Sequence, residues 1–498
     1  MVYPTLLVLS YQRKTKKMQI IQYVDGVCGS GKTHTAINKI AVRVAAGETV
    51  LYVTETKKLL EQTKAGLEKL NVPCGLVVAP KQSSWRKQYK SVVEEIIKAI
   101  STHAQIPHVI LCTTKSLIRA AHEIPADIKL PLYIDEGFIV AEGNEIISAT
   151  AAEAQGLMVK LGLSENKPEG FDGKGYKFPK EHRDIVLHAL NPLMVIETQL
   201  QKSKLQWNAY LDLPKFCSKF SEVTLLAACH EDTLQYYAFK AAGIEQVPQD
   251  WGLAKEHMTQ GTVNISYVLE NAEWRTTRKD KLTDSELQDI ALTFEREPWD
   301  DFINVNQIGG EGVSISVKSH GFNDFFKLHH FMDLHTQMPI PSTEKFFRER
   351  LDMSKSDIRK SCYHYDRYQG ALRTSLRNSR YDALGTEDLY YCFGDKGTAL
   401  YFASKLAPWV KKKIYKLPID LSIDTKGKAT YSNKISESKT EQNSRGRDKK
   451  RLTEINPNMS RLDEALIYLR DLRRTAKDNK EDLRVGKELL KQIAKDFT

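Results

Sequence analysis

The N-terminal part of the chain alternates short apolar runs with longer amphipathic stretches. Residues 32–46 and 56–70 carry apolar side chains at helical spacing, and Gly47 ends the first of these helices. Short strands alternating with helices are typical of a parallel sheet that is covered on both faces. The expected strands of this first block lie at 19–24, 49–54, 75–79, 109–113, 131–135 and 222–228.

The alternation is interrupted at about 143–219, where we expect a mostly helical insertion. A second block of the same kind then begins near residue 262. Its expected strands lie at 263–269, 302–305, 314–318, 330–334 and 389–393, and its expected helices at 368–377 and 398–410. The predicted fold class is therefore α/β, with two domains.

These patterns divide the chain into five parts. They are an N-terminal extension at 1–17 (with Met18 as a possible working start), a first domain at 18–261, a second domain at 262–424, a disordered linker at 425–459 and C-terminal helices at 460–498. The net charge is +10, and residues 425–498 hold 19 Lys and Arg against 12 Asp and Glu. A basic tail of this kind binds nucleic acid in many proteins, and a solvated linker explains it equally well. The apolar stripe of the C-terminal helices would suit a protein partner.

Composition excludes several classes of protein. Hydrophobic residues make up 41% of the chain and charged residues 27%, which excludes a wholly disordered chain. No apolar run approaches the ~18 residues that span a bilayer, so we expect no membrane contact. The seven cysteines form no C-x-x-C pair, which fits neither a zinc ribbon nor a disulfide framework. We therefore expect a cytoplasmic protein.

The strongest chemical signal is GVCGSGKT at 26–33, which matches G-x-x-x-x-G-K-[ST] between an expected strand and an expected helix. Glycines let backbone N–H groups turn toward a phosphate at the positive end of the helix dipole. Lys32 would reach the β- and γ-phosphates, and the Thr33 hydroxyl would bind Mg²⁺. The expected nucleotide-binding residues are Gly26, Cys28, Gly29, Ser30, Gly31, Lys32 and Thr33.

A second signal is the pair Asp135-Glu136 at the end of the strand LYID. Asp135 would hold Mg²⁺ and Glu136 would deprotonate the attacking water, as phosphoryl transfer requires. Alone, such a pair is more often a pair of acids at a helix N-terminus. The phosphate-binding loop upstream favours the catalytic interpretation.

With these motifs the chain resembles superfamily 2 DExx-box helicases and translocases over residues 19–410. The resemblance implies two RecA-like domains with ATP between them. DEGF at 135–138 looks like the DExx box, and segments 54–62 and 111–117 look like motifs that contact the nucleic-acid backbone. An ordinary helix cap is the alternative for each segment. The resemblance assigns nucleic-acid contacts to Thr54, Thr56, Lys57, Thr114 and Lys115, and to Ser319 in the motif V-like segment 318–323.

Two further motifs modify this picture. TLLAAC at 224–229 stands where the family has a hydroxyl-bearing motif III, so unwinding is less expected than translocation. YQGALRTSLR at 368–377 resembles motif VI, with Gln369, Arg373 and Arg377 on one expected helical face. Arg377, or else Arg373, would serve as the arginine finger, and Gln369 belongs to the same catalytic set. Solvated surface arginines are the alternative.

The resulting prediction is an ATP-dependent helicase or translocase that uses Mg²⁺. We expect DNA rather than RNA as its track. The wording of motifs V and VI resembles helicase-like proteins of phages and mobile elements, which implies replication in a host cytoplasm. Two alternatives stay open: a terminase-like DNA-packaging ATPase, and an origin-binding or loading factor that uses ATP as a switch.

Overall fold

The computed structural model describes residues 19–78, 85–102, 107–136, 138, 141–147, 185, 188–189, 191–201, 204–294, 302–305, 308, 312–315, 325–336, 338–378, 384–423 and 429–432. The expected extension at 1–17 with Met18, the candidate Ser319 and the C-terminal helices at 460–498 lie outside these residues. Within the described part, no helix has the length and hydrophobicity to cross a membrane.

The first sheet has seven parallel strands in the order β10-β1-β9-β5-β2-β4-β3. Its strands are β1 Ile20–Asp25, β2 Val50–Thr54, β3 Cys74–Val77, β4 Val109–Thr113, β5 Pro131–Asp135, β9 Glu222–Ala227 and β10 Glu245–Pro248. Its helices are α1 Lys32–Ala45, α2 Lys57–Lys69, α3 Trp85–Ser101, α4 Thr114–Ala120, η1 Ala121–Glu123, α7 Leu213–Cys217, η3 His230–Asp232 and α8 Leu234–Ala241.

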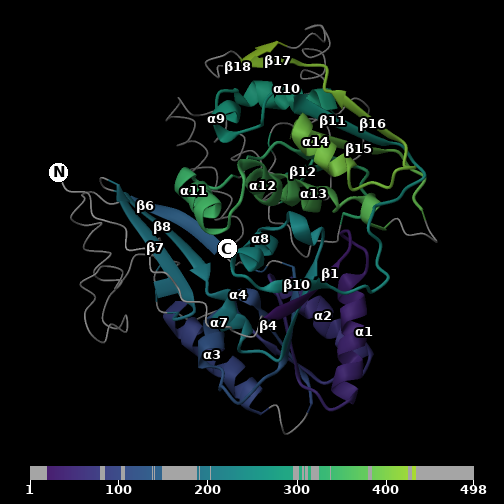
Figure 1. Cartoon of the computed structure of the whole chain (residues 1–498). Helices are drawn as coiled ribbons and strands as arrows, with labels where there is room; N and C mark the ends of the chain where they lie inside the picture. The colour runs from purple at the N-terminus through teal and green to yellow at the C-terminus, as the bar shows by residue number, and fades with distance from the viewer. Residues whose placement is uncertain are drawn as a thin grey trace, which may run out of the picture. The chain divides into compact units, whose positions relative to one another are not determined.

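Strand β2 shows why this sheet is covered on both faces. Leu51 and Val53 pack into one hydrophobic cluster with α3 and α4, and Val50 and Tyr52 pack into another with α1 and α2. Successive strand residues point to opposite faces, so both faces are buried. Figure 1 shows α1 and α2 on one side of the sheet and α3 on the other. The sequence prediction of a covered parallel sheet is confirmed.

The second sheet has six parallel strands in the order β13-β12-β14-β15-β11-β16. Its strands are β11 Val263–Leu269, β12 Ile303–Val305, β13 Val313–Ile315, β14 His330–Asp333, β15 Leu389–Asp395 and β16 Lys412–Lys416. The helices in this part of the chain are α9 Thr276–Lys279, α10 Asp284–Phe294, α11 Pro341–Arg350, α12 Lys355–Arg359, η4 Lys360–His364, α13 Tyr365–Ala371, η5 Ser375–Asn378 and α14 Lys396–Ala403. Of these, α11 packs Phe346 and Phe347 into the hydrophobic core of the first sheet. Two parallel sheets with helices confirm the α/β fold class.

The prediction of a helical insertion is wrong for the residues that the structure describes. Strands β6 Ala141–Ile147, β7 Met194–Gln201 and β8 Lys204–Leu211 form an antiparallel sheet in the order β6-β8-β7. The buried side chains of β8 alternate strictly, with Leu205, Trp207, Ala209 and Leu211 inside. This period of two is typical of a strand with one buried face.

A second prediction fails at residues 368–377, which do not form one helix. Helix α13 ends at Ala371, and the short helix η5 follows after a break. The backbone N–H of Ser375 donates to Leu328 O at 2.9 Å instead of to its own helix. A competing acceptor from a neighbouring segment therefore ends the helix, and Gln369, Arg373 and Arg377 do not share a helical face.

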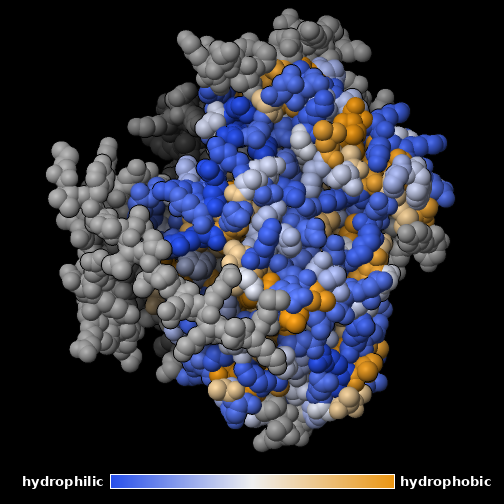
Figure 2. All heavy atoms as spheres, viewed as in Figure 1, coloured by the Kyte–Doolittle hydropathy of each residue, from blue (hydrophilic) through white to orange (hydrophobic). Residues whose placement is uncertain are grey.

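One short strand lies inside the segment that the sequence marks as disordered. β18 Ala429–Ser432 pairs with β17 Asp420–Ile423 in a two-stranded sheet. The rest of 425–459 lies outside the described residues, apart from these four. The face drawn in Figure 2 is mostly hydrophilic, with separate hydrophobic patches.

Candidate functional site

The loop between β1 and α1 has the backbone of a phosphate cradle. Gly29 and Gly31 have φ angles of 80° and 92°, in the left-handed region that glycine adopts without strain. Lys32 is buried, and its Nζ donates to the carbonyl oxygens of Gly26 and Val27 at 2.9 Å each. The loop leads directly into the 14-residue helix α1, whose N-terminus favours an anion.

Two further observations show that this loop fits a phosphate. The buried Ser30 Oγ has no hydrogen-bond partner within the described residues. A Cβ added to Gly26 would lie 2.8 Å from Ser30 Oγ and 3.2 Å from Ala254 O. The loop is therefore packed so closely that Gly26 has no room for a side chain, and it keeps an unsatisfied hydroxyl.

Asp135 at the end of β5 meets Thr33 at the start of α1. Thr33 Oγ1 donates to Asp135 Oδ2 at 2.6 Å, and the buried Tyr52 hydroxyl donates to the same oxygen. Burial and the neighbouring Glu136 raise the pKa of Asp135 to about 6, against the opposing effects of Thr33, Tyr52 and Lys32. A carboxylate and a hydroxyl held together beside a phosphate loop are oxygen ligands of the kind that Mg²⁺ takes.

Glu136 follows directly and has a left-handed backbone, with a φ of 51°. Its N–H donates to Leu226 O on the adjacent strand β9 at 3.2 Å. A non-glycine residue rarely adopts this conformation, and such residues cluster at functional sites. The turn takes the side chain of Glu136 out of the regular alternation of β5.

Residues of the second sheet face this loop from the opposite side. A Cβ added to Gly29 would lie 2.6 Å from Arg377 Cγ and 2.7 Å from Arg377 O. Burial lowers the pKa of Arg373, as does the charge of Arg377, while Glu136 raises it. Gln369 is buried, and its Nε2 donates to the Tyr365 hydroxyl at 2.5 Å. The structure thus brings both candidate arginines close to the phosphate loop and to Glu136.

Sequence reasoning missed a pair of side chains that touch this loop. The Cys28 N–H donates to the Tyr368 hydroxyl at 3.2 Å, and that hydroxyl lies 2.9 Å from His257 Nε2. Burial, together with the charges of Lys32 and Arg377, lowers the pKa of His257 to about 3, so its ring is neutral and can accept a hydrogen bond from the Tyr368 hydroxyl. Tyr368 lies inside the motif VI-like segment and could have been suspected. No pattern in the sequence marks His257.

The candidate nucleic-acid residues follow the same edge of the first sheet. Thr54 at the end of β2 is in register with Asp135 on β5 and with Thr113 on β4. Thr54 and Thr114 are buried. The Thr56 side chain caps α2 by accepting from Leu59 N at 3.3 Å, and Lys57 and Lys115 are exposed. These residues and Asp135 therefore share one carboxyl edge of the sheet, but only some of them reach the surface.

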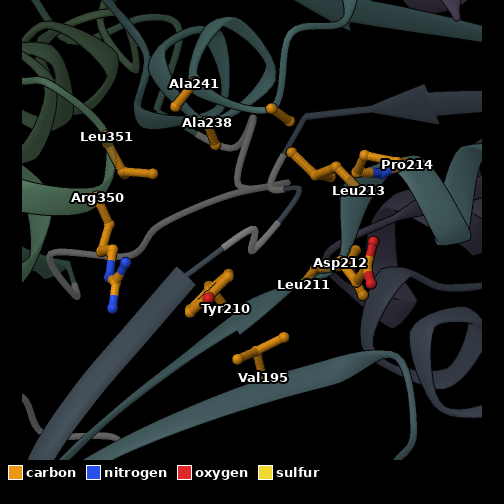
Figure 3. Close-up of a pocket in the computed structure, with 11 residues that line it drawn as sticks. Val195, Tyr210, Leu211, Asp212, Leu213, Pro214, Ala238, Ala241, Arg350 and Leu351 are labelled. Atoms are coloured by element: carbon orange, nitrogen blue, oxygen red, sulfur yellow. The ribbon is translucent and has the colours of Figure 1, made fainter. Parts of the chain in front are cut away.

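A separate pocket of about 270 Å³ lies between the insertion and helices α7, α8 and α11. Figure 3 shows Tyr210 and Val195 of the insertion on one side of it and Arg350 and Leu351 on the other. Its lining contains none of the nucleotide-binding candidates.

Comparison with known proteins shows which family the N-terminal part of this chain resembles. Residues 7–152 match the family model of the res subunit of Type III restriction enzymes, a span that holds the phosphate loop and the Asp135-Glu136 pair. This N-terminal part of the chain is therefore similar to that family. No curated protein matches it significantly.

Several solved helicases have a related chain trace at low similarity. An XPD helicase is 12% identical, with a TM-score of 0.43, over 79% of this chain and 96% of its own. Xpd4 of S. tokodaii is 10% identical with a TM-score of 0.42, over 79% and 96%. Mss116p bound to ssRNA and AMP-PNP is 13% identical with a TM-score of 0.35, over 80% and 72%. With scores this low, the fold description rests on the strand order given above.

Proposed function

We propose that this protein is an ATPase and a nucleic-acid translocase, which hydrolyses ATP between its two sheets and moves along DNA. The observation that carries the proposal is the position of Arg377, which packs against Gly29 of the phosphate loop although it belongs to the second sheet. A guanidinium that reaches a phosphate site from a second domain stabilises the charge of the transition state.

Each residue of the loop has a role in this proposal. Lys32 neutralises the phosphates, and the loop N–H groups of residues 26–33 orient them. The Thr33 hydroxyl and the Asp135 carboxylate would hold Mg²⁺, which supplies charge neutralisation at the phosphates. Glu136 orients and deprotonates the attacking water. Arg377 acts as the arginine finger, and Arg373 and Gln369 support it from the same segment.

The nucleic-acid part of the proposal uses the carboxyl edge of the first sheet. Lys57 and Lys115 are exposed at the starts of α2 and α4, where they can contact backbone phosphates together with Thr56. Buried Thr54 and Thr114 would shape this edge rather than touch the strand. Ser319 would contribute from the motif V-like segment.

The kind of movement, the track and the biological setting are proposed from the residues of the motif-like segments. Ala227 and Ala228 stand where the family carries hydroxyls, which favours translocation over strand separation. DNA as the track, and replication of a phage or mobile element as the setting, rest on the resemblance of segments 318–323 and 368–377.

Steady-state ATP hydrolysis tests the proposal, with and without single-stranded DNA or RNA. We expect DNA to stimulate turnover, Lys32→Ala to abolish it, and Arg377→Ala to reduce it by about 10³-fold or more, as the loss of an arginine finger does. Arg275→Ala is the matched control, because Arg275 is exposed and pairs with Glu273 of its own segment.

Stimulation by RNA and not by DNA would show that the protein moves along RNA. Turnover that is lost in Lys32→Ala but indifferent to nucleic acid and to Arg377 would contradict the motor. It would favour an ATP switch or a packaging ATPase.

A further inference from the structure

Asp232, in the short helix η3 after β9, binds three groups of the second sheet. Its Oδ2 lies 2.6 Å from Lys405 Nζ and accepts from the Tyr401 hydroxyl at 2.8 Å. Its Oδ1 lies 3.1 Å from Lys360 Nζ. The Asp232 carboxylate therefore joins helix α14, Lys405 two residues beyond its end, and the π-helical turn η4.

These contacts are more shielded than ordinary surface ion pairs. The side chains of Asp232 and Lys405 are 14% and 19% exposed. Burial favours a raised pKa for Asp232, but the hydrogen bond and the charge of Lys405 outweigh it and hold the pKa below its usual range. Exposed ion pairs contribute little, whereas a shielded carboxylate with several donors strongly disfavours separation of its partners.

The first sheet connects Asp232 to the phosphate loop through the backbone. The N–H of His230, two residues earlier, donates to Asp25 Oδ1 at 3.1 Å. Asp25 ends β1 and directly precedes Gly26. Between strand β9 and helix η3, Cys229 has a left-handed φ of 49°, which fixes the direction in which η3 leaves the sheet.

The second sheet connects the partners of Asp232 to the same loop. The backbone of Lys405 accepts from His257 N at 2.9 Å. The His257 ring lies 2.9 Å from the Tyr368 hydroxyl, which in turn accepts from Cys28 N. The two partners of the Asp232–Lys405 ion pair are thus both linked to the phosphate loop, one through each sheet.

We propose that Asp232 is a positioning residue that holds α14 and η4 against η3 of the first sheet and thereby couples nucleic-acid binding to ATP turnover. Asp232 lies just beyond Ala227-Ala228-Cys229. Its ion pairs with Lys360 and Lys405 therefore lie beside the segment that lacks the hydroxyl side chains of motif III. The coupling part rests on the translocase function proposed above.

The first test compares ATP hydrolysis with and without single-stranded DNA in Asp232→Asn, Lys405→Met and the double variant. Coupling between sites in proteins is typically about 5- to 150-fold, so we expect Asp232→Asn to lower the stimulation ratio by about tenfold. Basal turnover and the KM for ATP should change less than about threefold, because Asp232 does not contact the nucleotide loop itself. The double variant should be no worse than Asp232→Asn, since both remove one interaction.

Lys396→Met is the matched control. Lys396 lies on the same helix α14 and pairs with Glu270 of the second sheet, so its loss removes an ion pair without touching the first sheet. An equal loss of stimulation in Lys396→Met would overturn the proposal. Unchanged stimulation in Asp232→Asn, with a stimulated wild type, would overturn it as well.

A second readout needs no nucleic acid and separates this proposal from the translocase function. Fluorophores at Val42→Cys on α1 and Trp409→Cys after α14, both exposed positions, report the distance between the two sheets by energy transfer. The same protein without these two replacements measures labelling of the native cysteines. We expect one narrow population in the parent protein and a broader one in Asp232→Asn.

If the wild type shows no stimulation but Asp232→Asn broadens the distribution, the translocase function fails and the positioning role stands. An unchanged distribution overturns the positioning role, whatever the nucleic acid does.

Discussion

The hydroxyl of Tyr368 accepts a hydrogen bond from the backbone N–H of Cys28 at 3.2 Å, across 340 residues of sequence. This contact ties the segment that carries Arg377, the candidate arginine finger, to the candidate phosphate loop. The same hydroxyl lies 2.9 Å from the neutral ring of His257. Tyr368 therefore joins the second-sheet segment to this loop through its side chain, a contact that the sequence motifs do not predict.

Replacement of Tyr368 by phenylalanine should lower both the stability of the protein and its ATPase activity. Tyr368→Phe leaves the Cys28 N–H without its acceptor, and an unmet buried hydrogen bond costs about 1–3 kcal/mol of unfolding free energy. We expect kcat/KM for ATP to fall by about tenfold as the loop loosens. Tyr391→Phe is the control, because the buried Tyr391 hydroxyl bonds Thr374 instead, at 2.7 Å. Denaturant unfolding and steady-state kinetics on both variants check this. Equal kinetic loss in the control would contradict the role of Tyr368.

The two glycines Gly29 and Gly47 offer a matched comparison. Both have left-handed backbones, at 80° and 92°, but an added Cβ meets Arg377 at Gly29 and nothing within 4 Å at Gly47. Gly47→Ala should cost only about 1 kcal/mol of stability, with normal turnover. Gly29→Ala must displace Arg377, and a misplacement of about 1 Å can lower kcat by about 10²-fold. Single-turnover ATP hydrolysis checks the rate, and nucleotide titration checks binding. Normal turnover in Gly29→Ala would show that the Arg377 contact is not needed.

Asp135 should destabilise the fold at neutral pH. Its pKa is about 6 in the native state against an ordinary value of 3.8, so the native state holds the proton more tightly than the unfolded state. Stability is therefore lost as pH rises from about 4 to about 6, and the loss persists above pH 6. Asp135→Asn cannot ionise, so it should exceed the wild type by on the order of 1–3 kcal/mol at pH 7, and by little at pH 4. The same variant should have no ATPase activity. Thermal unfolding at both pH values, without nucleotide, is the measurement. A difference that does not grow with pH would contradict the raised pKa.

A buried ion pair in the second sheet makes a prediction about stability alone. Arg367 and Asp333 are almost fully buried, and Arg367 Nε lies 3.2 Å from Asp333 Oδ2. Arg367 Nη2 also donates to His335 O at 2.7 Å. Arg367→Met leaves the carboxylate buried without its partner, which costs about 3–5 kcal/mol. The double variant Arg367→Met/Asp333→Leu should recover most of this loss, because no buried charge remains. Urea unfolding of the single and double variants checks it, and additive losses would show that the two charges do not depend on each other.

The sequence predicted most strands of both sheets because their signal is local. Val109–Thr113, Pro131–Asp135 and Val263–Leu269 were predicted with the bounds that the structure has. Short apolar runs between helices leave few alternatives to a buried parallel strand. The insertion was mispredicted for a related reason. The alternation of buried and less buried residues at 205–211 is a local signal for a strand, and the expectation of a helix did not take it into account.

The sequence by itself also determined the position and backbone of the candidate phosphate loop, because its glycine spacing, Lys32 and Thr33 form a local motif between one strand and one helix. Only the tertiary structure decided what surrounds that loop. Tyr52 on Asp135, His257 beside Tyr368 and Asp232 beside Lys405 each join segments far apart in the sequence. Even the break in the helix before Arg377 depends on Leu328 O, an acceptor from another segment. Hydrogen bonds and charges act over a few ångströms in space, so no local pattern of residues encodes which distant groups will meet.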